Sequence, residues 1–311
     1  MEIAISAALT VVGLVMLCFG GNWLVSGGVA IARKFRISNL IIGMTIVAYG
    51  TSTPELAASI AAAGEHSAII LGNIIGSNIA NVGMVIGVAA IIVPLAVSKS
   101  VLKKEIPIML GVSVLLILIS IDGEISQYDG VLLLAGLGVF AYYTFRDAMK
   151  QREKTKDEVT QGANNVYLKS AGLIGIGVVL LYVGAILTVD NAVVLAKEFG
   201  LSEKIIGLTV IAIGTSLPEL ITSIIAIRKG HADIGVGNII GSNIYNILMI
   251  MGVGAALGGV MVGADVYVDY AIMIIFSLSL LIALKTGIIG RAMGIALTIG
   301  YVSYLIVTFF K

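Results

Sequence analysis

The chain is short of charge, cysteine and histidine, and each shortage excludes a class of protein. Lys, Arg, Asp and Glu make up 12% of its 311 residues, against roughly 25% in soluble domains. Cys18 is the one cysteine, which excludes a disulfide framework and a cysteine metal site. The two histidines, His66 and His231, fall in connections between apolar stretches, so a serine hydrolase would lack its base and we expect no enzyme. With 59% hydrophobic residues and a mean hydropathy of +1.08, the composition predicts an integral membrane protein.

The apolar stretches are long enough to cross a bilayer as helices, which takes about 20 residues. Ten-residue segments of alternating hydropathy, which mark membrane β-barrels, are absent. Residues 3–32 exceed the apolar part of a signal peptide and follow no basic segment, so we expect them to form a helix of the mature protein. The sequence predicts an all-α membrane fold of ten helices, at about residues 3–31, 38–63, 68–98, 103–121, 127–145, 167–196, 203–228, 233–259, 267–285 and 289–309.

One polar linker, residues 146–166, divides the chain into two halves of five predicted helices, residues 1–145 and 167–311. The connections after odd-numbered helices hold 16 Lys and Arg, whereas the even-numbered connections and both chain ends together hold 3. Cytoplasmic loops of membrane proteins carry the excess of Lys and Arg. We therefore expect a multi-pass protein of the cell membrane, with a cytoplasmic linker and both termini outside.

The two halves repeat each other. Residues 41–56 align with 205–220 at an offset of 164, and residues 72–81 align with 237–246 at an offset of 165. Because each half has an odd number of helices, the second copy enters the membrane from the opposite face. Inverted repeats of this kind are typical of secondary transporters, whose site lies at the midplane between the repeats. The two motif regions span residues 41–87 and 205–252.

The repeated Gly-Thr-Ser-x-Pro-Glu segments, residues 50–55 and 214–219, place a proline and a glutamate inside an apolar helix. An ionisable side chain at membrane depth is costly and indicates a functional site. Proline removes a backbone donor, so we expect it to free carbonyl groups around Ala48, Gly50 and Thr51 in the first copy and around Ala212, Gly214 and Thr215 in the second. The serine and asparagine of each Gly-Ser-Asn-x-x-x-Asn segment lie four residues apart on one helical face.

Together these residues form a set of oxygen ligands with two carboxylates and no imidazole or thiolate, which suits Ca²⁺. Na⁺ in smaller oxygen pockets would compete for the same glutamates. A proline kink, and serine or asparagine contacts between helices, are the structural alternatives for single residues. The candidate site residues are Ala48, Thr51, Ser52, Glu55, Ser77 and Asn81 in the first half, and Ala212, Thr215, Ser216, Glu219, Ser242 and Asn246 in the second.

The duplicated motifs, Gly-Thr-Ser-x-Pro-Glu and Gly-Asn-x-x-Gly-Ser-Asn, resemble the sodium/calcium exchanger family of the cation/calcium antiporter superfamily. The short linker makes the chain similar to prokaryotic and archaeal members. The resemblance implies antiport of Na⁺ against Ca²⁺ by alternating access, without a cofactor, nucleic acid or obligate protein partner. It also implies that the first and sixth helices slide across a rigid core, a motion to which the small residues Gly20, Gly21, Gly27 and Gly28 are suited.

The same resemblance assigns roles to the candidate residues. Glu55 and Glu219 would bind Ca²⁺ centrally, helped by the carbonyls of Thr51 and Thr215. Na⁺ would be bound by the alanine carbonyls and the four serine hydroxyls, and both asparagines would flank the centre. Potassium-dependent relatives carry aspartate where this chain has Asn246, so we expect exchange that does not require K⁺.

Two other functions stay open at this point. A proton/calcium antiporter is the alternative, because a buried glutamate pair can also carry protons. Proton/calcium antiporters of the same superfamily have a Gly-Asn-x-x-Glu pattern, whereas this chain has Gly76 at the last position. This difference counts against proton/calcium antiport. A cation channel would need a ring of carboxylates around a pore, which two repeats in one chain do not favour.

Overall fold

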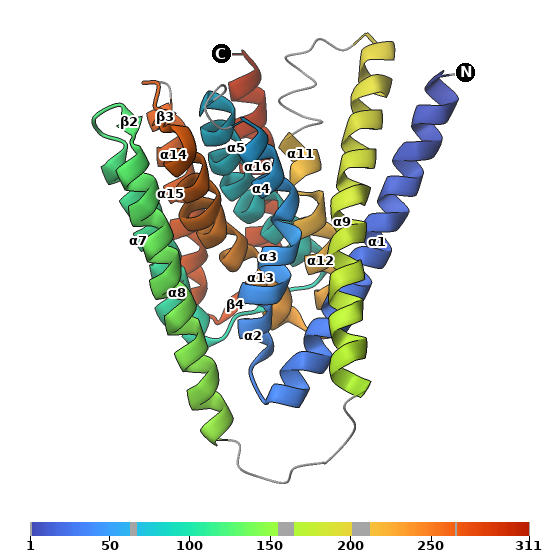
Figure 1. Ribbon diagram of the computed structural model, residues 1–311, viewed down its shortest axis with the longest axis vertical. Helices are drawn as coiled ribbons and strands as arrows, with labels where there is room; N and C mark the ends of the chain where they lie inside the picture. The colour runs from blue at the N-terminus through green and yellow to red at the C-terminus, as the bar shows by residue number, and fades with distance from the viewer. Residues whose placement is uncertain (1, 63–66, 155–164, 201–211, 265, 311) are drawn as a thin grey trace.

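Helices make up nearly all of the structure, a computed structural model that describes residues 2–62, 67–154, 165–200, 212–264 and 266–310 (Figure 1). The first turn of the first helix and the last turn of the last helix lie at the same end of the molecule (Figure 1). In the part of the chain described, seven helices are long and apolar enough to cross a membrane. They span residues 3–35, 70–92, 127–150, 167–198, 232–258, 266–284 and 291–308.

The two motif regions are built from shorter helices placed end to end, with π-helical turns between them. Those of the first half are α2 (Asn39–Ile42), η1 (Gly43–Val47), α3 (Ala48–Thr51), α4 (Thr53–Ala62), α5 (Ser67–Ala80), η2 (Asn81–Ile86) and α6 (Gly87–Ile92). Those of the second half are α11 (Ala212–Thr215), α12 (Leu217–Arg228), α13 (Ala232–Tyr245), η5 (Asn246–Met251) and α14 (Gly252–Gly258). Part of the predicted helix 203–228 lies outside the described residues.

The other helices surround these motif segments (Figure 1). They are α1 (Glu2–Phe35), η3 (Val101–Glu105), α7 (Ile106–Ile119), α8 (Gln127–Lys154), α9 (Asn165–Glu198), α15 (Val266–Ser279), η6 (Leu280–Leu284) and α16 (Arg291–Phe310). Four strands of two residues each lie at the helix ends: β1 (Leu95–Ala96), β2 (Glu124–Ile125), β3 (Val260–Met261) and β4 (Ile288–Ile289).

Two predicted helix boundaries are wrong, for identifiable reasons. The predicted helix 68–98 ends at Ile92, because Val93 precedes a proline and is extended, with φ −140° and ψ 124°. Proline disfavours the helical conformation of the residue before it. The first nine residues of the predicted linker are helical, because α8 continues to Lys154. Lys, Glu, Arg, Gln and Ala favour helix, so the charged segment extends α8 instead of ending it.

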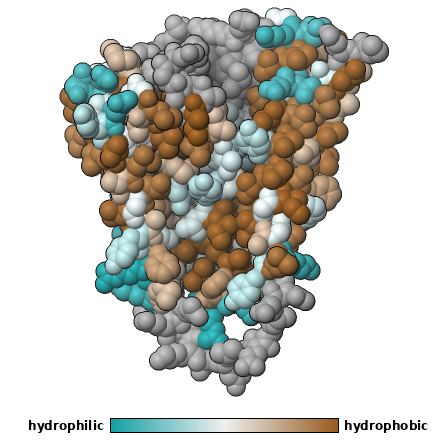
Figure 2. Space-filling view, in the orientation of Figure 1, coloured by the Kyte–Doolittle hydropathy of each residue, from teal (hydrophilic) through white to brown (hydrophobic). Residues whose placement is uncertain are grey.

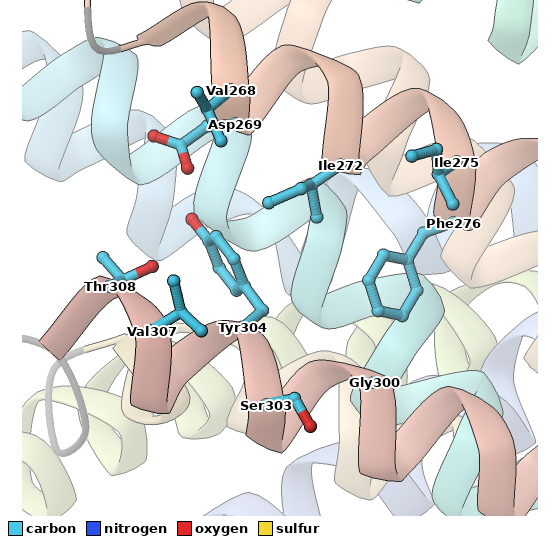
Figure 3. Close-up of a pocket in the computed structure, with 10 residues that line it drawn as sticks. All are labelled: Val268, Asp269, Ile272, Ile275, Phe276, Gly300, Ser303, Tyr304, Val307 and Thr308. Carbon is cyan, nitrogen blue, oxygen red and sulfur yellow. The ribbon is translucent and has the colours of Figure 1, made fainter. Parts of the chain in front are cut away.

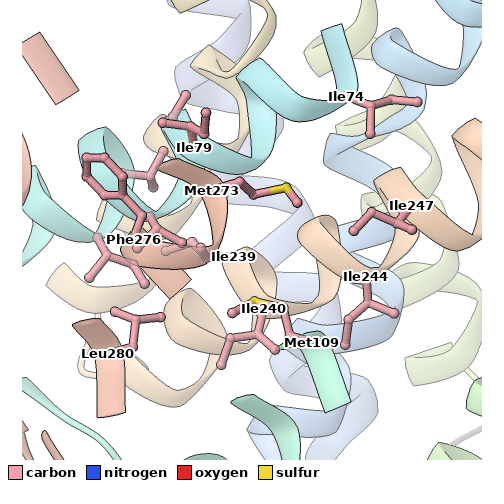
Figure 4. Packing of buried hydrophobic residues seen from close by; sticks show 14 of the residues in the cluster. Ile74, Ile79, Met109, Ile239, Ile240, Ile244, Ile247, Met273, Phe276 and Leu280 are labelled. Carbon is pink, nitrogen blue, oxygen red and sulfur yellow. The ribbon is translucent and has the colours of Figure 1, made fainter. Parts of the chain in front are cut away.

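The motif helices form the core, and α1, α8, α9 and α16 form the rim. In the most apolar 18-residue windows of residues 70–92 and 232–258, 83% and 89% of the residues are buried, against less than a third in the four rim helices. Isoleucines of α5 and α13 pack with Met109, Met273 and Phe276 in the largest buried cluster (Figure 4). Apolar side chains cover both flanks of the outer surface at mid-height in Figure 2, with a paler strip between them, and the most hydrophilic ones gather towards the two ends. A bilayer would solvate such a band.

Contacts between the two halves come in pairs that a shift of 164 or 165 residues interchanges. β1 pairs antiparallel with β4, and β2 pairs antiparallel with β3. β1 and β3 lie 165 residues apart in the chain, and β2 and β4 lie 164 residues apart. Each half therefore contributes one strand to each small sheet.

The pair of long helices α1 and α9 follows the same rule. A Cβ atom added to Gly20 would lie 2.8 Å from the carbonyl oxygen of Gly177, and one added to Gly184 would lie 2.9 Å from that of Gly13. The two contacts interchange under a shift of 164 residues. Glycine at these positions lets the two antiparallel backbones (Figure 1) come closer than any larger residue allows.

Candidate ion-binding site

Each Gly-Thr-Ser-x-Pro-Glu motif breaks its helix at the serine. Ser52 has φ −85° and ψ 9° between α3 and α4, and Ser216 has φ −90° and ψ 4° between α11 and α12. The proline of each motif is the second residue of the following helix, where a missing N–H removes no intrahelical bond. Glu55 and Glu219 therefore both fall in the first turn of a new helix, the end at which a negative charge is stabilised.

Of the carbonyls that the first proline was predicted to free, around Ala48, Gly50 and Thr51, that of Ala48 is not free. That oxygen accepts a hydrogen bond from the backbone N–H of Ser52 at 3.0 Å and another from the Thr51 hydroxyl at 3.2 Å. Proline withholds its donor from the residue four positions earlier, which is Gly50, so the ladder remains intact upstream. In the second half the Ser216 N–H donates to the carbonyl of Ile213 instead, at 3.1 Å.

Side chains of both halves meet at Glu219. The Ser52 hydroxyl lies 3.0 Å from Glu219 Oε1 and 3.1 Å from the Ser242 hydroxyl, which itself donates to Glu219 Oε1 at 3.4 Å. Glu55 is close enough for its charge to interact with that of Glu219. Glu55 is 2% exposed and Glu219 is 1% exposed, so two carboxylates share one buried region.

Unpartnered oxygen atoms are concentrated among the predicted residues. Among the described residues, nine buried side-chain oxygens have no hydrogen-bond partner, and six of them belong to the predicted set. Buried polar atoms are almost always hydrogen-bonded, and each exception costs about 1–3 kcal/mol. The six atoms are Glu55 Oε2, Glu219 Oε2, Ser77 Oγ, Ser216 Oγ, Asn81 Oδ1 and Asn246 Oδ1.

Four asparagines hold the two amide oxygens in place. Asn81 donates its side-chain N–H to Asn243 Oδ1, and Asn246 donates to Asn78 Oδ1, both at 2.9 Å. Asn78 and Asn243 in turn each donate to the backbone carbonyl of the other, at 3.3 Å. Because the amide nitrogens of Asn81 and Asn246 are used, their oxygens are the atoms left to accept a further partner.

Sequence reasoning missed Asn78 and Asn243, and it also missed Asn238. It considered only the helical face that carries the residues at i and i+4, Ser77 with Asn81 and Ser242 with Asn246, and Asn78 and Asn243 are not part of that pattern. Asn78 and Asn243 are the asparagines of the two Gly-Ser-Asn copies, and this repetition could have identified them. Asn238 Oδ1 accepts a hydrogen bond from the Thr51 hydroxyl at 3.1 Å, and its amide donates to Ser223 at 3.0 Å.

The remaining predicted residues differ in their surroundings. Thr51 is fully buried, whereas Thr215 is half-buried. Ala212 begins α11, which places its carbonyl in the turn before the break. The described residues contain no group of three or more His, Cys, Asp or Glu side chains that could hold a metal ion. The candidate set differs from such a group, since it combines two carboxylates with hydroxyl, amide and backbone oxygens, which hard cations accept.

Known proteins resemble this chain over nearly its full length. The sequence pattern described as "Sodium/calcium exchanger protein" matches residues 5–146 and 169–310. The inner membrane protein YrbG of Escherichia coli is 38% identical over 97% of this chain and 96% of its own. The sodium/calcium exchanger MaX1 of Methanosarcina acetivorans is 32% identical over 99% of both chains. A solved structure of the sodium-calcium exchanger NCX_Mj, soaked with 10 mM Na⁺ and no Ca²⁺, is 36% identical, with a TM-score of 0.86 over 98% of this chain and 99% of that one. The chain belongs to the sodium/calcium exchanger family.

Proposed function

We propose that this protein is a secondary antiporter that exchanges Na⁺ for Ca²⁺ across the cell membrane. The observation that carries the proposal is the set of six unpartnered oxygens on predicted site residues of both halves. A bound cation would satisfy these atoms and neutralise Glu55 and Glu219, which are otherwise two carboxylates buried together. Na⁺ and Ca²⁺ both need the carboxylates of Glu55 and Glu219, so binding of one excludes the other, which is the condition for exchange.

The proposed roles follow the surroundings of each residue. Ca²⁺ binds centrally to Glu55 and Glu219 with the carbonyls of Thr51 and Thr215, and Asn81 and Asn246 flank that position with their amide oxygens. Na⁺ takes smaller pockets that share both glutamates. Those pockets are formed by the carbonyls of Ala48 and Ala212 and the hydroxyls of Ser52, Ser77, Ser216 and Ser242. Exchange of more than two Na⁺ for one Ca²⁺ moves net charge, so we propose that transport is electrogenic.

We place this site between two inverted repeats of five membrane helices, residues 1–145 and 167–311, which makes ten crossings in all. The interchangeable strand pairs and glycine contacts support the inverted repeats. The position of both ends of the chain at one end of the molecule supports an even number of crossings (Figure 1). The distribution of Lys and Arg supports a cytoplasmic linker and outside termini.

Uptake of ⁴⁵Ca²⁺ into proteoliposomes loaded with Na⁺ tests the proposal. We expect uptake that depends on the outward Na⁺ gradient and falls to background in Glu55→Gln and in Glu219→Gln. Glu124→Gln is the matched control, because Glu124 is an exposed glutamate at the start of the two-residue strand β2. Gradient-dependent uptake retained by both site variants would refute the site.

Further arms of the same assay separate the finer parts of the proposal. The outward current of positive charge that the Na⁺ gradient drives during Ca²⁺ uptake would be absent if exchange were electroneutral. Replacement of K⁺ by choline leaves uptake unchanged if Asn246 makes exchange independent of K⁺. A proton gradient that drives uptake without Na⁺ would favour the proton/calcium antiporter instead.

A further inference from the structure

A cavity of about 600 Å³ lies between α15 and α16, and every residue that lines it belongs to one of these two helices (Figure 3). It therefore contains no residue of the motif helices, which carry Glu55 and Glu219. Access to these buried carboxylates is determined instead by how the motif helices pack against one another. The two halves differ in that packing, although they repeat each other in sequence.

The motif helices are packed closely along α13. A Cβ atom added to Gly241 of α13 would lie 2.7 Å from the carbonyl oxygen of Met44 and 2.8 Å from the Cβ atom of Ala48. Gly237, Asn238 and Gly241 are all buried. The segments η1 and α3 of the first half therefore cover the face of α13 that carries these residues.

The corresponding face of α5 is open. Gly76 and Gly72 lie 165 residues before the two glycines of α13, and no described atom lies within 4 Å of a Cβ atom added to either. Ala212, the counterpart of Ala48, is thus further from Gly76 than Ala48 is from its own glycine. Gly72 is exposed. In the proposed orientation the first turns of α5 lie towards the outside and those of α13 towards the cytoplasm, so the described residues leave the site more open on the outer side.

A pair of side-chain hydrogen bonds accompanies the closed side. The Asn238 amide donates to the Ser223 hydroxyl at 3.0 Å, and Asn238 Oδ1 accepts from the Thr51 hydroxyl at 3.1 Å. Ser223 lies on α12 of the second half, whereas Thr51 ends α3 of the first half. Asn238 therefore ties α13 both to its neighbour in sequence and to the segment that covers it.

The counterpart of this contact is not formed in the first half. Asn73 lies 165 residues before Asn238, and Ser59 lies 164 residues before Ser223. Ser59 is 2% exposed, yet its hydroxyl has no hydrogen-bond partner, so Asn73, which is half-buried, does not bond to it. Ser59 Oγ is one of the three unpartnered buried oxygens that lie outside the predicted ion site. Such an atom calls for an explanation, and a second conformation that supplies its partner is one.

We propose that Asn238 and Asn73 act as alternating locks on the two sides of the ion site. The inference rests on the proposed function, because an antiporter opens its site to one side at a time. Exchange of the conformations of the two inverted halves gives a state that is closed along α5 and open along α13. In that state Asn73 donates to Ser59, and Asn238 is released from Ser223. Each state then leaves one of the two buried serines without a partner, so the exchange of locks changes the free energy little.

Hydrogen exchange of the full-length protein in lipid nanodiscs, without Na⁺ or Ca²⁺, tests the proposal. The measured quantity is the exchange rate of the backbone amides in the first turns of α13, which are covered in this structure and uncovered in the opposite state. Asn238→Ala removes the lock that is closed here, and we expect these amides to exchange roughly two- to tenfold faster, as for the loss of one hydrogen bond. Asn73→Ala removes the opposite lock, and we expect the same amides to exchange more slowly by a similar factor.

The slower exchange in Asn73→Ala is the diagnostic result, because a merely structural role of Asn73 would loosen α5 and leave α13 unchanged. Ser59→Ala, which removes the proposed partner of Asn73, is expected to slow α13 in the same way. The double variant Asn73→Ala with Asn238→Ala is expected to return towards the unaltered rate. Asn191→Ala, a matched control that removes a bond to the Leu187 carbonyl, is expected to leave the rate unchanged. Exchange in α13 that responds to neither Asn73→Ala nor Ser59→Ala would overturn the proposal.

The locks and the antiport can fail separately. Uptake of ⁴⁵Ca²⁺ by the unaltered protein that does not depend on the Na⁺ gradient would refute the antiport. Gradient-dependent uptake together with α13 exchange that is the same in the unaltered protein, Asn73→Ala and Ser59→Ala would refute the locks alone.

Discussion

Replacing Asn243 by leucine tests whether the asparagine contacts between the two halves set the ion site. Leucine has a similar shape but removes the oxygen that accepts from Asn81 at 2.9 Å and the amide that donates to the Asn78 carbonyl at 3.3 Å. The amide nitrogen of Asn81 is then buried without an acceptor, which costs about 1–3 kcal/mol. The Asn81 side chain can recover part of this cost by rotating its amide, which turns Asn81 Oδ1 away from the proposed ion.

The expected result is a loss of Ca²⁺ affinity as well as of stability. If the same 1–3 kcal/mol is taken from ion binding, the KM for Ca²⁺ uptake rises roughly five- to 150-fold. The measurement is the Ca²⁺ dependence of uptake in proteoliposomes, together with thermal unfolding in the presence and absence of Ca²⁺. Because the contacts interchange between the halves, Asn78→Leu is expected to have the same effect through Asn246.

The matched control is Asn191→Leu, since Asn191 makes only a local bond to the Leu187 carbonyl, at 2.8 Å, among the contacts described for it. The double variant Asn81→Leu with Asn243→Leu is expected to raise KM no more than Asn81→Leu alone, because both changes remove the same contact. Additive effects, or an unchanged KM in Asn243→Leu, would refute the idea that Asn243 acts through Asn81.

Two further predictions concern stability. Burial lowers the pKa of His231 below its usual 6.5, and nearby positive side chains lower it further. As the pH falls, His231 is therefore protonated in the unfolded chain before it is protonated in the folded protein. The free energy of unfolding falls as the pH drops from 6.5 through the lowered pKa. We expect the melting temperatures of the unaltered protein and of His231→Gln, measured from pH 7.5 to 5, to converge at high pH. Melting temperatures that depend on pH with the same slope in both proteins would contradict a lowered pKa of His231. Gly20→Leu inserts a side chain where a Cβ lies 2.8 Å from the Gly177 carbonyl, so it should destabilise by about 1–3 kcal/mol. Gly175→Ala should not destabilise the protein, because no described atom lies within 4 Å of a Cβ at that position. Equal melting temperatures for the two variants would refute the close contact between Gly20 and Gly177.

Much of the fold could be read from the sequence because the membrane restricts the choices. Without water, backbone groups must bond within a helix, so long apolar stretches were sufficient to predict most helix positions within a few residues. The end of the third stretch at Ile92 was also readable, since Pro94 follows Val93 directly. The helical course of residues 146–154 was not, because polar composition was taken to indicate a loop although the same residues favour helix.

The site was predicted less completely because its contacts join segments about 165 residues apart. The repeated motif identified Glu55 and Glu219 through the cost of burying them, a property of each residue alone. Asn78 and Asn243 show their role only when the halves are placed together, since each bonds to the other's backbone. The Ala48 carbonyl keeps its bonds because Pro54 withholds a donor only from the carbonyl four residues earlier, that of Gly50.

The reciprocal asparagine bonds have a consequence for how the two halves are joined. The side-chain amide of Asn78 donates to the backbone carbonyl of Asn243, and that of Asn243 donates to the backbone carbonyl of Asn78. The strand pairs and the glycine contacts are likewise interchanged when the two halves are exchanged. This is the self-complementarity of a two-fold symmetric dimer interface, here closed within one chain. A single half could make the same bonds with a second copy of itself inserted upside down. The linker sets the stoichiometry of the halves, and the bonds themselves set their orientation.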